Sequence, residues 1–176
     1  MAKPFDDQKK SSDLEAKKDY IRYLRAQIGH QPCLSVGLTA LIVNEKNEIL
    51  VEKRTDNGLY CFPGGSLDYE EKIVDGLKRE VREETGIALH KVQLFALASG
   101  PSETLLYPNG DITNYVDLTF YCPVQSSNCP LKISDGESTA LFFVALENFP
   151  SKKECLRGTY LLLEKLKKGD FSITID

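Results

Sequence analysis

The sequence predicts a single domain of mixed α/β class, in which helices pack on a mixed sheet. Strand-like stretches lie on both sides of one central stretch with helical spacing, and a further helix is expected near each end of the chain. The chain has 176 residues, which is the length of one ordinary domain, and it contains no internal repeat. These observations together favour one core between a sheet and its helices.

The amino end is expected to form a helix that follows a flexible polar segment of residues 1–11. Ser12 with Glu15 forms a capping-box pattern, and Gly29 is a favourable residue just beyond a helix end. The apolar residues at helical spacing between them are Tyr20, Ile21, Leu24 and Ile28. We predict a helix over 12–29 with a structural role, and contact with a partner or dimerisation is the alternative.

A hairpin, a loop and the central helix are predicted next. The stretches 34–43 and 48–54 are rich in β-branched and apolar residues and are joined by a polar turn, which indicates a hairpin. Residues 55–65, TDNGLYCFPGG, are dense in Asn, Gly and Pro and are predicted to form a loop. Helical spacing then predicts a helix over 68–85, which a glycine ends.

Four more strands and a helix are predicted in the second half of the chain. The strand-like stretches are 90–99, 102–107, 115–124 and 139–145, with a YPNGD turn between two of them. Ser151 with Glu154 is a second capping-box pattern, and it predicts a helix over 151–168. The domain is therefore expected to span residues 12–176, with its core over 34–149.

Composition argues against several classes of protein. The net charge of -4 leaves no basic surface for nucleic acid. No apolar run approaches the roughly 20 residues that cross a bilayer. The amino end also lacks the apolar segment of a signal peptide, so we expect no membrane association and a cytoplasmic location. The five cysteines include no C-x-x-C pair and are expected to be free thiols.

Three acidic residues of the predicted central helix form a cluster. Glu80, Glu83 and Glu84 follow i, i+3, i+4 spacing, which places them on one face, and Ile73 and Leu77 precede them in the same row. The carboxylates therefore continue the apolar stripe, and inward-facing like charges are costly unless a cation compensates them. Carboxylate oxygens suit Mg²⁺, with Mn²⁺ as the alternative. A solvated acidic face is the competing interpretation, which we accept for Glu70 and Asp75.

The residues around this cluster follow a known pattern. Its positions are Gly65, Glu71, Arg79, Glu80, Val81, Glu83, Glu84, Gly86 and Ile87. This spacing resembles the Nudix box at every defining position, and the FPGG stretch at 62–65 is similar to that family's usual lead-in. The resemblance implies a Nudix hydrolase of the MutT-like or ADP-ribose pyrophosphatase-like branch, with an α/β/α sandwich fold and a divalent metal ion.

The resemblance also implies catalytic roles for individual residues. Glu80, Glu83 and Glu84 are expected to bind the metal ion, together with the backbone carbonyl of Gly64. Arg79 is expected to orient the glutamates by ion pairing, and its i+4 relation to Glu83 makes this physically reasonable. The metal would neutralise pyrophosphate oxygens and help to generate the hydroxide that attacks phosphorus.

Residues outside the acidic cluster are expected to contact the substrate or move a proton. Arg54 is expected to contact a phosphate, with a surface charge at a strand end as the alternative. Phe62 and Tyr115 are expected to bind the substrate, and a simple hairpin turn is the competing interpretation for the region of Tyr115. Glu137 is the candidate general base, with an ordinary turn acid as the alternative. Glu71 is expected to steady the loop and the helix start.

The expected activity is hydrolysis of a pyrophosphate bond in a nucleoside diphosphate linked to another moiety. ADP-ribose-like compounds and nucleoside triphosphates, oxidised ones included, are the two substrate classes. The expected partner is this small nucleotide, and a homodimer is an open alternative for the assembly. The competing function is a module that senses a nucleotide without cleaving it, but a pure sensor would have no need of the complete motif.

Overall fold

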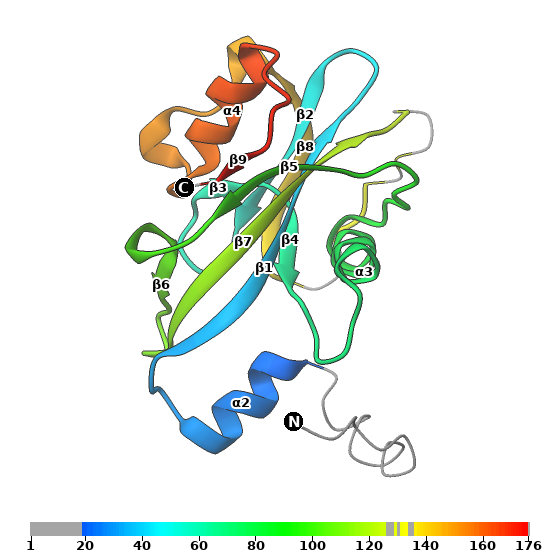
Figure 1. The fold of residues 1–176 in the computed structure, drawn as a ribbon. Helices are drawn as coiled ribbons and strands as arrows, with labels where there is room; N and C mark the ends of the chain where they lie inside the picture. Colours follow the sequence, from blue (N-terminus) through cyan, green and yellow to red (C-terminus); the bar gives the residue numbers. More distant parts are fainter. Residues whose placement is uncertain (1–18, 126–128, 130, 134–135, 176) are drawn as a thin grey trace.

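The computed structural model describes residues 19–125, 129, 131–133 and 136–175, and it confirms the α/β class. Its helices are α2 (Tyr20–Ile28), α3 (Ile73–Thr85) and α4 (Thr159–Lys167). Figure 1 shows α3 and α4 on opposite sides of a central sheet, with α2 near one end of the sheet. The three layers give the predicted α/β/α arrangement.

Within the described residues, nine strands form one mixed sheet. The strands are β1 (Cys33–Val43), β2 (Glu48–Arg54), β3 (Tyr60–Cys61), β4 (Gly64–Ser66), β5 (Gln93–Ala98), β6 (Thr104–Leu106), β7 (Ile112–Pro123), β8 (Ser138–Ala145) and β9 (Thr174–Ile175). The main path runs β3-β2-β1-β7-β5-β9, while β4 pairs with β1, β6 with β7, and β8 with β2. The parallel pairing of β1 with β7 joins the two halves of the chain along the whole length of β1.

Two apolar cores lie on the two faces of the sheet. On one face, alternate residues of β1 such as Leu38 and Ala40 pack in a cluster with Leu77 and Val81 of α3. On the other face, a second cluster contains Leu41 and Val43 of β1, Phe95 of β5 and Leu163 of α4. Because β1 is covered on both faces, its sequence is a nearly continuous apolar run, as expected for a buried strand.

The predicted hairpin is present, but the predicted loop at 55–65 is not entirely loop. β1 and β2 pair antiparallel next to their turn, and most of β2 pairs with β8. Within 55–65, two residues form β3 and pair with β2, and residues from 64 onward form β4 and pair with β1. Sequence composition did not reveal these short strands because their pairing partners lie elsewhere in the chain.

The central helix starts later than predicted. It ends at Gly86 as expected, with a left-handed φ of 77° and an N–H that donates to the Arg82 carbonyl. Its first turn begins at Ile73 rather than at 68, because Glu70 has a positive φ of 59° that no helix accommodates. The Glu71 carboxylate accepts the Asp68 N–H at 3.1 Å, which holds this segment in an irregular turn.

The amino-terminal helix α2 packs near the same turn. Its described part starts at Tyr20, with Asp19 as a capping residue that accepts the Arg22 N–H at 3.1 Å. The predicted capping box at residues 12 and 15 lies outside the described residues. The Tyr20 N–H donates to Asp68 Oδ1 at 2.9 Å, so this helix is attached to the segment that precedes α3.

The predicted helix over 151–168 is wrong in its first half. The capping box of Ser151 and Glu154 is present, but it caps a short 3₁₀ turn. The chain is extended at Cys155, and α4 begins only after Gly158, whose φ is 95°. The four predicted strands of the second half are β5 to β8 with shifted ends, and β9 was not predicted.

Two further expectations concern thiols and membranes. All five cysteines are free, as predicted. Among the described residues, no helix combines the length and the apolar character that a membrane span requires.

Candidate active site

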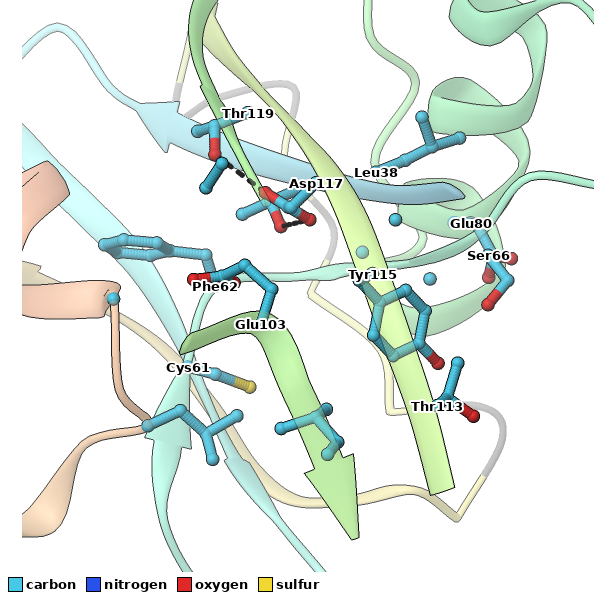
Figure 2. Close-up of a pocket in the computed structure, with 18 of the residues that line it drawn as sticks. Leu38, Cys61, Phe62, Ser66, Glu80, Glu103, Thr113, Tyr115, Asp117 and Thr119 are labelled. Atoms are coloured by element: carbon cyan, nitrogen blue, oxygen red, sulfur yellow. Dashed lines mark hydrogen bonds between the residues drawn. The ribbon is translucent and has the colours of Figure 1, made fainter. Parts of the chain in front are cut away.

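A cleft of about 1240 Å³ opens between the first two-thirds of β7, the amino end of α4 and the glutamate face of α3. Every residue proposed from the sequence lines it: Arg54, Phe62, Gly64, Arg79, Glu80, Glu83, Glu84, Tyr115 and Glu137. Figure 2 shows Phe62, Tyr115 and Asp117 around one opening, with Glu80 and Ser66 to one side. The fold therefore gathers residues from distant parts of the chain at one cavity.

Arg79 is the centre of an ion-pair network beside the glutamates of α3. Its Nε and Nη2 donate to the two carboxylate oxygens of Glu71 at 2.9 and 2.7 Å, a bidentate pair. Its Nη2 also donates to the Ser66 carbonyl at 3.2 Å, and its Nη1 lies 2.8 Å from Glu80 Oε1. Glu83, the partner expected from spacing, is 3.6 Å away. The Arg79 hydrogen bonds lower the pKa of Glu71, so Glu71 stays ionised.

The three glutamates of α3 differ in exposure and in their partners. Glu83 is 60% exposed, whereas the Glu80 side chain is 17% exposed and Glu84 is buried. The Gly64 N–H donates to Glu84 Oε2 at 2.7 Å, which fixes the β4 backbone against the helix. Burial raises the pKa of Glu80, although the ion pair with Arg79 opposes the shift. The three glutamates on this face of α3 thus range from exposed (Glu83) to buried (Glu84).

The donor chemistry of this face fits a hard divalent cation. Carboxylate oxygens from adjacent turns and a backbone carbonyl are typical ligands for Mg²⁺. A cation nearby would also stabilise the ionised form of Glu80, whose burial otherwise disfavours its charge. In the described part of the chain, no three His, Cys, Asp or Glu side chains already converge on one metal position. The ligand atoms are of the chemical type that this cation prefers. Metal binding would require the carboxylates to rotate away from the hydrogen bonds and ion pairs that they form within the protein.

Gly65 provides the space that Glu80 occupies. A Cβ on Gly65 would lie within 2.6 Å of both Glu80 carboxylate oxygens, closer than packing permits. A Gly65→Ala substitution should therefore displace the Glu80 carboxylate and lower turnover about tenfold, less than the roughly hundredfold effect of a 1 Å misplacement. Steady-state kinetics would measure the loss, and thermal unfolding would measure any strain.

A second substitution tests the cause of this effect. In a Glu80→Ala background the added methyl group has room, so Gly65→Ala should no longer lower the unfolding temperature. An equal loss of stability in both backgrounds would contradict a contact between the two residues.

Another part of the cleft lining combines an arginine with two tyrosines. Arg54 Nε and Nη2 donate to the two oxygens of Asp56, each at 2.9 Å, and this pairing raises the pKa of Arg54. The Tyr107 and Tyr115 hydroxyls lie 2.9 Å apart. Burial raises the pKa of Tyr107, so it stays protonated. Arg54 is thus an oriented cation inside the cleft rather than an isolated surface charge.

Glu137 lies at the rim, directly before β8. Its side chain is exposed and lines the cleft, and its backbone carbonyl accepts the Thr55 N–H at 2.8 Å. The Thr55 hydroxyl donates to the same carbonyl. These bonds hold the backbone at Glu137 against the end of β2, which brings an acidic side chain to the same cleft as the α3 glutamates.

Several carboxyl groups that line the cleft were not predicted from the sequence, among them Glu52 and Asp117. Glu52 of β2 is 3% exposed and accepts hydrogen bonds from Cys61 Sγ at 3.0 Å and Ser138 Oγ at 2.9 Å. Asp117 of β7 also lines the cleft, and burial raises its pKa. The available signal in the sequence was an acidic residue inside an apolar strand. Such a residue is unusual, because Asp and Glu side chains are almost never buried without a partner.

Comparison with known proteins gives a family match over most of the chain. Residues 34–162 match the family model described as the NUDIX domain. An ADP-ribose pyrophosphatase from Methanocaldococcus jannaschii is 30% identical over 112 residues, which cover 62% of this chain and 61% of that protein. A MutT-like protein from Streptomyces ambofaciens is 40% identical over 63 residues, or 36% of this chain and 41% of that protein.

A solved structure gives the same picture over a larger share of the chain. The crystal structure of a MutT NUDIX hydrolase from Burkholderia pseudomallei aligns with a TM-score of 0.61 at 27% identity, and covers 77% of this chain and 98% of that one. The chain spans about half the length of the curated relatives it matches.

Proposed function

The chain belongs to the Nudix family, and on that premise we propose that it is a metal-dependent pyrophosphohydrolase. The substrate is a nucleoside diphosphate linked to another moiety, and water attacks one of its phosphorus atoms. The observation that carries this proposal is the meeting of the α3 glutamates, the β4 backbone and Arg54 at one cleft. That combination can hold a cation and a polyanion together in a protein of net charge -4.

The residues proposed to hold Mg²⁺, or Mn²⁺, are Glu80, Glu83 and Glu84 with the carbonyl of Gly64. When bound, the metal supplies charge neutralisation at the pyrophosphate oxygens and lowers the pKa of a coordinated water. The hydrogen bond from the Gly64 N–H to Glu84 supports this assignment, because it holds the backbone beside the carboxylates. Arg79 keeps the Glu80 carboxylate oriented through its ion pair.

Arg54 and Glu137 are proposed to act on the substrate directly. Arg54 donates to a phosphate oxygen, and its pairing with Asp56 fixes the guanidinium in the cleft beforehand. Glu137 accepts the proton of the attacking water as general base. The water oxygen bonds to phosphorus and the bridging P–O bond breaks, which leaves a nucleoside monophosphate and a second phosphorylated product.

Two substrate classes remain in the proposal, ADP-ribose-like compounds and nucleoside triphosphates, oxidised ones included. One relative is named an ADP-ribose pyrophosphatase, which supports the first class. The second class rests on the resemblance of the motif to the MutT-like branch. The tyrosine pair at 107 and 115 and the ring of Phe62 supply aromatic and hydroxyl groups for the nucleoside part.

A substrate panel tests the activity. We expect purified protein with Mg²⁺ at slightly alkaline pH to release a nucleoside monophosphate from at least one of ADP-ribose, dinucleoside polyphosphates, NADH, and nucleoside triphosphates including oxidised ones. Chromatography of the products measures this release, and EDTA should abolish it. If the panel stays intact with Mg²⁺ and with Mn²⁺ while calorimetry detects nucleotide binding, the chain is a sensing module instead of an enzyme.

A further inference from the structure

The floor of the cleft is formed by β1, β4, β5 and β7, and these strands carry one carboxyl group, Asp117, which the proposed reaction does not use. Strand pairing sets Asp117 of β7 opposite Gly37 of β1 on one side and Ala98 of β5 on the other, and Ser66 of β4 lies beyond Gly37. All four residues line the cleft. Because the other three have small side chains or none, the Asp117 carboxyl dominates this row of the floor.

Asp117 is held in place by its neighbours. The Thr39 hydroxyl donates to Oδ1 at 2.9 Å. The Thr119 hydroxyl donates to Oδ2 at 3.0 Å, as Figure 2 shows. A Cβ on Gly37 would lie 2.7 Å from Oδ1, so the carboxyl leans over a position that only glycine leaves open. A carboxylate accepts about four hydrogen bonds, and these two leave acceptor capacity on both oxygens.

The position of Asp117 separates it from the proposed metal site. Gly64 pairs with Thr39 of β1, which pairs with Thr119 of β7, so Gly64 lies two strands away and in the next row along. At the usual strand spacing of about 4.8 Å, this places the Asp117 backbone roughly 10 Å or more from Gly64. A carboxylate would repel phosphate oxygens, so this part of the floor suits a neutral part of the substrate.

We propose that Asp117 is a specificity-determining residue that accepts a hydrogen bond from an O–H or N–H group of the substrate's nucleoside. The donor is a ribose hydroxyl or an N–H of the base. Tyr115 and Glu103 border the same opening, which leaves the nucleoside room beside the carboxyl (Figure 2). This inference rests on the proposed function, because it takes a nucleotide as the ligand of the cleft.

Matched ligand pairs test the inference through binding. Calorimetry compares AMP with 2′-deoxy-AMP and 3′-deoxy-AMP for the ribose, and GMP with IMP and AMP with purine riboside monophosphate for amino groups. We expect the wild type to separate at least one pair by about 10- to 100-fold, as hydrogen bonds to charged groups do. In Asp117→Asn that ratio should fall to about threefold or less, because the amide loses the charge that strengthens the hydrogen bond and replaces one of the two acceptor oxygens with a donor.

The control is Asp75→Asn, which makes the same chemical change at an exposed acid outside the cleft and should keep every ratio at the wild-type value. If Asp117→Asn does not fold, Thr119→Val serves as the second variant. It removes one hydroxyl that orients the carboxyl, and it should reduce the same ratio severalfold while leaving the other pairs unchanged.

Two results would overturn the inference. One is a wild type that separates no pair by more than about threefold, and the other is a discriminated pair whose ratio is unaffected by the substitution at Asp117. A purely structural role for Asp117 would lower the unfolding temperature without changing the ratio.

Hydrolysis is measured on the same preparations, so an active enzyme with unchanged ratios counts against Asp117 alone. Discrimination that depends on Asp117 without hydrolysis counts against the proposed reaction alone.

Discussion

Glu84→Gln should lower kcat by about 100- to 1000-fold while the protein stays folded. Loss of one carboxylate charge from the proposed metal site should remove several kcal/mol of transition-state stabilisation, and each 1.36 kcal/mol is a factor of ten in rate. The substitution isolates charge from architecture, because the amide oxygen of glutamine can still accept the Gly64 N–H that Glu84 accepts at 2.7 Å. The β4 backbone should therefore remain docked against α3.

The measurement is kcat at saturating substrate across a Mg²⁺ titration, with thermal unfolding in parallel. Asp75→Asn is the matched control, since Asp75 is an exposed acid of the same helix that does not line the cleft. Glu83→Gln should also lose most turnover, and its 60% exposure should spare stability. Wild-type kcat in Glu84→Gln and Glu83→Gln alike would refute the proposed ligands.

The acidic face of α3 could be predicted because helix geometry is local. Spacing alone places Glu80, Glu83 and Glu84 on one face, and all three line the cleft. Spacing could not identify their partners. The bidentate partner of Arg79 is Glu71, which precedes the helix, and this pairing depends on a positive φ at Glu70 that is uncommon for a glutamate.

The carboxyl-terminal helix shows why a local sequence pattern can predict too long a helix. A capping box involves only residues three apart, so it looks the same before a 3₁₀ turn and before an α-helix. The continuation is decided by tertiary contacts. Cys155 pairs with Tyr60 in an isolated parallel β-bridge, and the Leu156 N–H donates to the Tyr60 carbonyl at 2.9 Å. These backbone contacts hold the chain extended there.

The floor of the cleft lay beyond sequence reasoning for a related reason. Alternation along 113–119 indicates which residues of β7 share a face. It does not say that this strand pairs in parallel with β1, or that Gly37 lies opposite Asp117. Strand register is a long-range property, so the environment of Asp117 became visible only when the strands were assembled.

Arg79→Lys should produce the second large effect, on stability and on rate together. The arginine contacts Glu71, Glu80 and the Ser66 carbonyl at once. A lysine ammonium is a compact point charge that cannot reproduce the bidentate pair. Breaking a buried ion pair costs about 3–5 kcal/mol, and because Arg79 is 27% exposed we expect about 2–3 kcal/mol of lost stability. Misorientation of Glu80 should lower kcat by about 10- to 100-fold.

Glu71→Gln separates the two consequences of losing Arg79. It weakens the anchor that ties the 68–72 turn to α3, but it leaves the 2.8 Å contact between Arg79 and Glu80. We therefore expect it to lose a comparable part of the stability and much less of the rate. Unfolding in denaturant and kcat, measured on both variants and on the exposed control Arg82→Lys, give the comparison. Equal rate losses in Arg79→Lys and Glu71→Gln would mean that Arg79 acts only as an anchor, because an orienting role for Glu80 requires the arginine variant to be slower.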